Sequence, residues 1–339
     1  MPNNSFVKAF NEETMKTMRL IQLTASTRKT SLVWQLPIIL SSQAISQIIF
    51  LGIFWIFNRT NDQMNFQNNW FVKGELFSTS VSLILVVLYS YVIEKRSLHS
   101  LGITRKDIGS ETYKGLIIGC LLICVIVAIN VVTGSIQLIW VPNISLLNTL
   151  IYGIGFMIQG LSEEVIFRGY LMIGLCTRFS IKVSIVLSSL IFTLAHTSNG
   201  GSSIVSITNL FLFSIVCSLI VYSHQNIWII ASLHGAWNFV MGVVFGSEIS
   251  NLSLPSSLFQ FQLVPTRSIL SGGNFGIEGG IITTVILLTT CILLNNLISH
   301  ELVTSNIKQC NVNMISSPFR PLLINAMVII NDSFYIIGT

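Results

Sequence analysis

Long stretches of this chain carry no formal charge, and this constrains its fold more than any other feature. No Asp, Glu, Lys or Arg occurs in residues 115–162 or in residues 183–247. Charged residues make up 9% of the 339 residues, whereas a soluble domain has about 25%. Because such a chain has too few polar side chains to coat a soluble globule, we place it among membrane proteins.

Eight apolar segments predict membrane helices, since a span takes about 20 residues. We place them at about 31–57, 76–93, 115–132, 147–176, 181–196, 203–222, 227–246 and 279–298. Two glycines at the start of the third segment favour close packing against a neighbouring helix. The predicted fold class is all-α: a polytopic membrane helix bundle of about eight transmembrane helices.

The segments divide the chain into three parts. Residues 1–30 form a cytoplasmic N-terminal segment, 31–298 the transmembrane domain, and 299–339 a C-terminal tail. The tail contains an apolar run at 322–337 that is too short and too polar to count as a further span. The loop 247–278 is rich in Gly, Ser and Pro, and we expect it outside the cytoplasm.

The distribution of basic residues predicts the orientation, because cytoplasmic loops are enriched in Lys and Arg. The loops on one side of the predicted bundle hold only Arg59, Lys73 and Arg267, and all other Lys and Arg residues fall on the opposite side. With an even number of spans, both termini then lie in the cytoplasm. We interpret the basic residues behind the net charge of +5 as determinants of membrane orientation, and we expect no nucleic-acid binding.

A polar cluster interrupts the fourth span, which contains the sequence LSEEVIFR (Leu161–Arg168). A charged side chain at the bilayer centre costs about 2.5–3.5 kcal/mol on insertion scales. Glu164 and Arg168 are four residues apart, so they share one helical face and can form an ion pair. Glu163 is rotated by about 100° and is free to point into a cavity. The alternative is a purely structural cluster at a helix end.

Two further polar sets lie in uncharged helices. His196 ends the fifth segment in FTLAH, and His234 and Asn238 share one face of the seventh in HGAWN. Glu164 and His196 are about equally far from the turn between the fourth and fifth segments, so an antiparallel hairpin puts the two glutamates and His196 at one depth. We therefore expect an intramembrane polar cavity in the cytoplasmic half. A lone histidine in a membrane helix can also be structural.

A carboxylate, two imidazoles and an amide suit hydrolysis of a peptide bond without a covalent intermediate. The carboxylate takes a proton from water, and imidazole and amide groups donate to the developing oxyanion. No GxSxG or HExxH pattern occurs. Two histidines and a glutamate also match a catalytic zinc set, so zinc stays possible with Glu163, His196 and His234 as ligands. The mechanism we favour requires no cofactor.

The motifs EExxxR, FxxxH and HxxxN, in this order on successive membrane helices, resemble those of the CAAX protease and bacteriocin-processing family of intramembrane endopeptidases. This family includes the type II CAAX prenyl endopeptidase. The resemblance is clear over about 147–246, the motif core of the predicted domain. It implies an enzyme that cleaves a peptide or membrane-protein substrate in the lipid bilayer.

The resemblance also implies roles for six motif residues: Glu163, Glu164, Arg168, His196, His234 and Asn238. The first glutamate would be the general base that activates water, assisted by His196. The second glutamate and Arg168 would support it, and His234 with Asn238 would form the oxyanion hole. The family is commonly classed with the metalloendopeptidases.

The biological setting follows only from the family. Eukaryotic members remove the last three residues of prenylated CAAX proteins, and bacterial members occur in bacteriocin processing or self-immunity. The Ile- and Asn-rich composition suggests a bacterial cell membrane, where a CAAX substrate is not expected.

Two other functions stay open. One is a non-catalytic membrane protein, such as a bacteriocin-immunity factor or a scaffold. The other is a proton-coupled transporter, in which buried Glu and His residues relay protons. An inverted repeat with Gly- or Pro-broken helices would favour a transporter, and we find no such repeat in the sequence.

Overall fold

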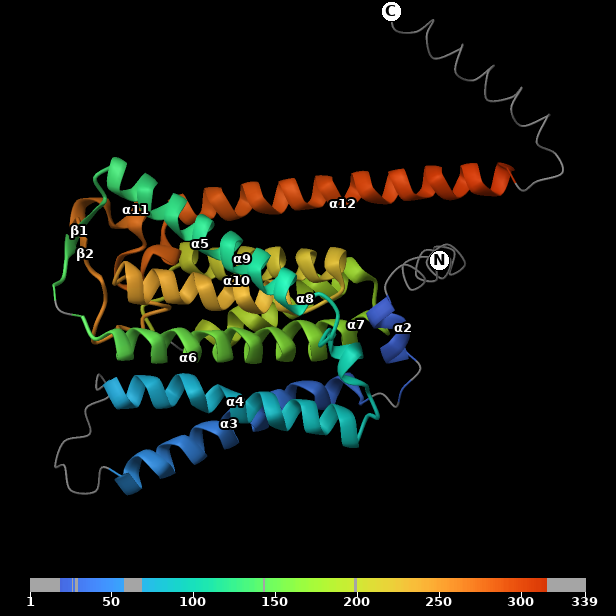
Figure 1. Ribbon diagram of the computed structural model, residues 1–339, viewed down its shortest axis with the longest axis horizontal. Coiled ribbons are helices and arrows are strands. Elements are labelled where there is room, and N and C mark those ends of the chain that lie inside the picture. The colour runs from blue at the N-terminus through green and yellow to red at the C-terminus, as the bar shows by residue number, and fades with distance from the viewer. Residues whose placement is uncertain are drawn as a thin grey trace, which may run out of the picture. The chain divides into compact units, whose positions relative to one another are not determined.

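A computed structural model describes residues 19–315, except for 26, 28–29, 58–68, 143 and 198–199. All eight predicted segments are helical in it (Figure 1). They are α3 (Leu32–Phe57), α4 (Asn69–Val92), α5 (Ile108–Val132), α6 (Leu146–Glu164) with its continuation to Cys176, α8 (Ile181–His196), α9 (Ile204–His224), α10 (Trp228–Phe239) and α12 (Ile281–Ile315). The predicted polytopic helical membrane bundle is confirmed.

Six of the described helices are long and apolar enough to cross a membrane: α3, α4, α5, the helix that starts with α6, α9 and α12. The other two, α8 and α10 with its continuation, are shorter apolar helices. The 16 residues of α8 reach about 24 Å, less than the roughly 30 Å of a hydrocarbon core. These short helices supply His196 and His234, so both imidazoles come from helices that are shorter than a full membrane span.

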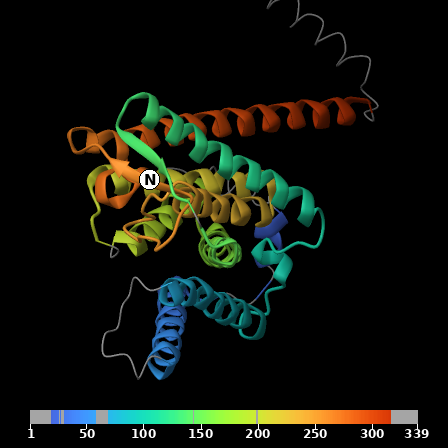
Figure 2. The ribbon, with the colours of Figure 1, turned by 60° about the vertical axis from the view of Figure 1, so that its left-hand side comes forward.

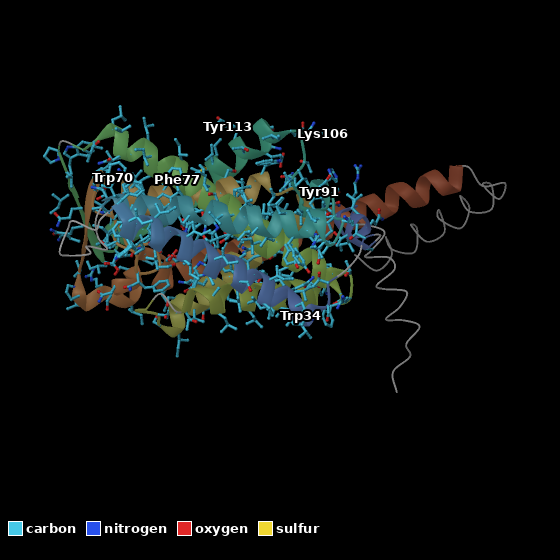
Figure 3. The ribbon with its side chains drawn as sticks, turned by 90° about the horizontal axis from the view of Figure 1, so that it is seen from below. Trp34, Trp70, Phe77, Tyr91, Lys106 and Tyr113 are labelled. Atoms are coloured by element: carbon cyan, nitrogen blue, oxygen red, sulfur yellow. The ribbon has the colours of Figure 1, made fainter. Side chains whose placement is uncertain are left out.

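Exposed aromatic residues mark both ends of the α3–α4 pair. Trp34 is 62% exposed at the start of α3, and Tyr91 is 61% exposed near the end of the antiparallel α4. Trp70, 72% exposed, lies at the opposite end (Figure 3). Aromatic side chains in two such bands are typical of the membrane–water interfaces. The arrangement is that of an integral membrane protein.

Helix α6 lies between two of its neighbours in the bundle. It packs against α4 on one side and against α10 on the other, and α10 also packs against α5. Figure 1 shows α3 and α4 together on one side of α6, and Figure 2 views α6 nearly end-on between its neighbours. The face of α6 that carries Leu150 and Ile154 stays exposed, 56% for each, whereas Glu164 is fully buried. The neighbouring helices therefore keep this polar side chain away from lipid.

Small residues allow the close approach of α5 and α10, as the sequence predicted. A Cβ atom at Gly115 would clash with the carbonyl of Ile229, and one at Gly119 would clash with the carbonyl of Leu233. Because lipid tails are as apolar as the helices, such close packing is a main source of helix association in membranes. The two glycines hold α10, and with it the HxxxN motif, against the bundle.

The α6 helix continues without a break into a π-helix, η2 (Val165–Met172), and then into α7 (Ile173–Cys176). The guanidinium of Arg96 is buried and donates to the carbonyls of Gly169 and Tyr170, at 2.8 and 3.3 Å. These bonds satisfy carbonyl groups within the widened turns. π-Helical turns are frequent at functional sites, and this one directly follows the two glutamates.

The loop 247–278 is more structured than the sequence predicted. It contains β2 (Phe259–Leu263), which pairs antiparallel with β1 (Ile136–Trp140) in the register Ile136 to Leu263. Short helical turns follow, namely η5 (Pro265–Arg267), α11 (Ser268–Ser271), η6 (Gly273–Phe275) and η7 (Ile277–Gly279). This small sheet was not expected, because its strands are far apart in the sequence. Near the other end of the spans, α2 (Arg19–Ala25) and η1 (Leu98–Leu101) are further unpredicted short helices.

The chain forms two compact units, with a division between Cys291 and Ile292 inside α12. The motif helices and the small sheet belong to the first unit. The apolar run predicted at 322–337 lies outside the described residues.

The α5–α10 packing is tested by two alanine substitutions in one helix. Gly119→Ala should destabilise the protein by about 1–3 kcal/mol through overpacking, measured as a lower thermal midpoint in detergent. Gly109→Ala is the matched control, because a Cβ there meets nothing within 4 Å, and alanine favours a helix by about 0.5–1 kcal/mol. Equal midpoints for the two variants would contradict this packing.

Candidate functional site

A cavity of about 390 Å³ lies among the helices of the first unit. Four of the six motif residues line it: Glu163, His196, His234 and Asn238. They come from α6, α8 and α10, so the three separate motifs of the sequence converge on one space. Glu164 and Arg168 lie fully buried beside the cavity.

The second glutamate forms the predicted ion pair with the arginine. Arg168 Nη1 donates to Glu164 Oε1 at 2.9 Å, and neither side chain is exposed. Arg168 Nη2 also donates to the hydroxyl of Ser214 at 2.9 Å. Charges buried away from water are tolerated only when paired and hydrogen-bonded in this way.

The same carboxylate oxygen also holds one of the histidines. His234 Nδ1 lies 2.9 Å from Glu164 Oε1. Glu164 thus bridges α6 to α10 and contacts His234 rather than His196, the residue placed at its depth by the sequence. A carboxylate acts only as an acceptor when ionised, so Nδ1 of His234 carries the proton and Nε2 faces the cavity.

The first glutamate points the other way, between the two imidazoles. Its Oε2 lies 3.5 Å from His196 Nε2 and 4.0 Å from His234 Nε2. This oxygen is shielded from bulk solvent and has no hydrogen-bond partner among the described residues. Both separations exceed a normal hydrogen bond, so the three atoms surround a position that a small bridging molecule would fill.

The phenylalanine of the FxxxH motif orients its histidine. His196 Nδ1 lies 2.9 Å from the carbonyl oxygen of Phe192, which can only accept, so this nitrogen carries the proton. The two rings lie with centroids 4.4 Å apart, and the Arg168 guanidinium lies 4.5 Å from the Phe192 ring. Phe192 therefore connects the buried ion pair to His196, a role that the sequence did not reveal.

The sequence analysis missed several polar residues of the cavity, among them Gln159 and Asn209. Gln159 accepts from Asn238 Nδ2 at 3.3 Å, and its position four residues before Glu163 was a usable signal. Asn209 of α9 is 2% exposed and donates through Nδ2 to the carbonyls of Glu278 and Gly280, at 2.7 and 2.8 Å. Nothing in the sequence around Asn209 marks it.

Glu278 also lines the cavity, although the sequence placed it only in a loop. Its carboxyl accepts from the Ser250 hydroxyl and from Trp237 Nε1, the latter at 3.5 Å. Burial raises the pKa of Glu278 above its ordinary value, and this effect outweighs the opposing hydrogen bond from Ser250. The 247–278 loop is therefore part of the cavity wall.

The predicted alternative zinc ligands were Glu163, His196 and His234. Within the described part of the chain, no group of three or more His, Cys, Asp or Glu residues is placed so that it could hold a metal ion.

The fold and the site together define a polytopic membrane protein with carboxylate, imidazole and amide groups gathered in a buried cavity. Residues 145–240 match the family model described as type II CAAX prenyl endopeptidase Rce1-like. The match contains all six motif residues and confirms the resemblance inferred from the sequence. This family comprises intramembrane proteases. No curated protein matches the chain.

The unequal surroundings of the two glutamates predict unequal effects on stability. Glu164→Gln leaves the Arg168 charge buried without its partner and should cost about 3–5 kcal/mol. Glu163→Gln is the matched control one residue away and should change the stability by less than about 1 kcal/mol, because it has no arginine partner. Thermal unfolding in detergent measures both. A larger loss for Glu163→Gln would refute this assignment.

Proposed function

We propose that this protein is an intramembrane endopeptidase in which Glu163 activates a water molecule for attack on a peptide bond. The observation that carries the proposal is the unpartnered Glu163 Oε2, held between two imidazole Nε2 atoms in a cavity. A general base must lie within reach of the proton that it removes, directly or through one water. The position between these three atoms suits such a water.

The state of His196 supports this role. Its Nδ1 proton is committed to the Phe192 carbonyl, so Nε2 of the neutral ring is an acceptor. A water between Glu163 and His196 would donate one hydrogen to each and present its oxygen to the substrate carbonyl. Glu163 takes the proton as the C–O bond forms, and His196 keeps the water oriented.

The oxyanion that forms needs donors on its other side. His234 is suited to this as an imidazolium, with Nδ1–H on Glu164 and Nε2–H directed to the cavity. Asn238 Nδ2 is the second donor and would exchange its long bond to Gln159 for the oxyanion. Donors fixed before the reaction stabilise developing charge without reorganisation. Protonated Glu163 then delivers its proton to the leaving amine.

The buried pair supports these steps without touching the substrate. Glu164 contacts both the His234 ring and the Arg168 guanidinium, and its carboxylate balances the charge proposed for His234. The same arginine contacts Phe192, on which His196 rests. We propose that Glu164 and Arg168 position both imidazoles.

The wider setting belongs to the same proposal. We place the protein in a bacterial cell membrane because of its Ile- and Asn-rich composition. Both termini lie in the cytoplasm in this proposal because of the basic loops. Its substrate is a peptide or membrane protein that reaches the cavity within the bilayer. Bacteriocin processing or immunity, or removal of a C-terminal CAAX-type segment, are the roles that the family suggests.

Substitution of the proposed base tests the activity. Glu163→Gln in reconstituted protein should reduce kcat of peptide cleavage by about 10²–10⁴-fold, with little change in KM. Glu248→Gln is the control, because this carboxylate does not line the cavity. Undiminished turnover by Glu163→Gln would show that Glu163 is not the general base. Protection of cells by this variant would point to a non-catalytic immunity protein.

A chelator, added to the same assay, distinguishes metal-free hydrolysis from zinc-dependent hydrolysis. Because Glu163 activates the water without a metal ion in the proposed mechanism, cleavage by the purified protein should persist in excess EDTA or 1,10-phenanthroline. Inactivation by chelator that is reversed by added Zn²⁺ would contradict the metal-free mechanism.

A further inference from the structure

The formal charges that line the cavity are those of carboxylates, apart from the charge proposed above for His234. Glu75, Glu163 and Glu278 are lining residues, and the described lining contains no Lys or Arg. The nearby cations are engaged elsewhere, since Lys73 donates to Asn148 at 2.6 Å and Arg168 binds Glu164. A substrate that enters this space meets carboxylates and imidazoles, and the charge of His234 is already balanced by Glu164.

Glu75 is the unmatched member of this set. It lies in the membrane-spanning helix α4, and its carboxylate makes no hydrogen bond or ion pair with any described residue. The other two carboxylates differ from Glu75 because they already have polar neighbours. Glu163 faces two histidines, and Glu278 accepts from two donors. An ionisable residue inside a membrane segment is costly and, by default, marks a functional site.

The remaining polar groups also favour a ligand rich in hydrogen-bond donors. The buried lining atoms without a partner are Glu163 Oε2 and Asn209 Oδ1, and both are acceptors. The orientation of Asn209 is fixed, because its Nδ2 donates to two carbonyls and so leaves the oxygen free. The amides of Gln43 and Gln47 from α3 line the same cavity, and amide groups solvate a charged group without neutralising it.

We propose that the cavity selects a peptide segment with a Lys or Arg side chain close to the scissile bond, and that Glu75 recognises this cation. The inference rests on the proposed peptidase function and names its substrate class. A free C-terminal carboxylate near the scissile bond is disfavoured by the same carboxylates. Cleavage therefore falls inside a cationic segment rather than three residues from a chain end.

Binding to the inactive Glu163→Gln protein tests the recognition apart from the chemistry. The probes are fluorescent apolar peptides that differ at one central residue, which is Lys, norleucine or Glu, each with an amidated or a free C-terminus. We expect the Lys peptide to bind about tenfold more tightly than the norleucine peptide, a difference of about 1.4 kcal/mol. Amidated peptides should bind at least as well as free acids.

Variants of Glu75 in the Glu163→Gln protein test whether Glu75 recognises the cation. Glu75→Gln should abolish the preference for Lys, and Glu75→Lys should reverse it in favour of the Glu peptide. Glu248→Gln, a carboxylate outside the cavity lining, should keep the preference. A Lys preference that survives Glu75→Gln, or no preference at all, would overturn the proposal.

Cleavage of the same peptides by protein with Glu163 intact separates this inference from the proposed function. Charge-selective binding that depends on Glu75, with no cleavage, would uphold the recognition and refute the peptidase activity. Cleavage that is indifferent to the central residue would uphold the peptidase activity and refute the recognition by Glu75.

Discussion

The buried ion pair between Glu164 and Arg168 is the interaction on which the site depends. Both side chains are fully buried, and each has one further partner, His234 for the glutamate and Ser214 for the arginine. A pair of this kind is tolerable in a membrane interior only because every charge is matched. It joins α6, α9 and α10, and through Phe192 it also reaches α8. One pair of charges thus fixes the helices that carry all three motifs.

Helix geometry lets two adjacent glutamates have different surroundings. A step of one residue turns the side chain by about 100°, so Glu164 faces its buried partners while Glu163 faces the cavity. The structure shows this difference, since Glu164 Oε1 contacts both Arg168 and His234 at 2.9 Å, whereas Glu163 Oε2 has no hydrogen-bond partner among the described residues and lies 3.5 Å from the nearer imidazole nitrogen. A stable buried charge and a reactive one are therefore produced by neighbours in the sequence. The short helices α8 and α10 then bring the two imidazoles close to Glu163.

The sequence predicted the helices and the convergence of the motifs, because both depend on local periodicity and on the cost of charge in lipid. The four-residue spacing gave the Glu164–Arg168 pair, and the distance from the turn placed Glu163 level with His196. It did not predict the pairing of Glu164 with His234, since nothing local fixes how α10 rotates against α6. Asn209 and Glu278 were missed for the same reason: their contacts join segments about 70 residues apart. The β1–β2 sheet is another such long-range pairing.

The central claim is that Glu163 and the two histidines share one bound water. An experimental structure of the protein in lipid nanodiscs, at a resolution that shows ordered solvent, tests it most directly. We predict a water oxygen within hydrogen-bonding distance, about 2.6–3.2 Å, of both Glu163 Oε2 and His196 Nε2. A Glu163 carboxyl and a His196 ring too far apart to contact the same water molecule would contradict the account.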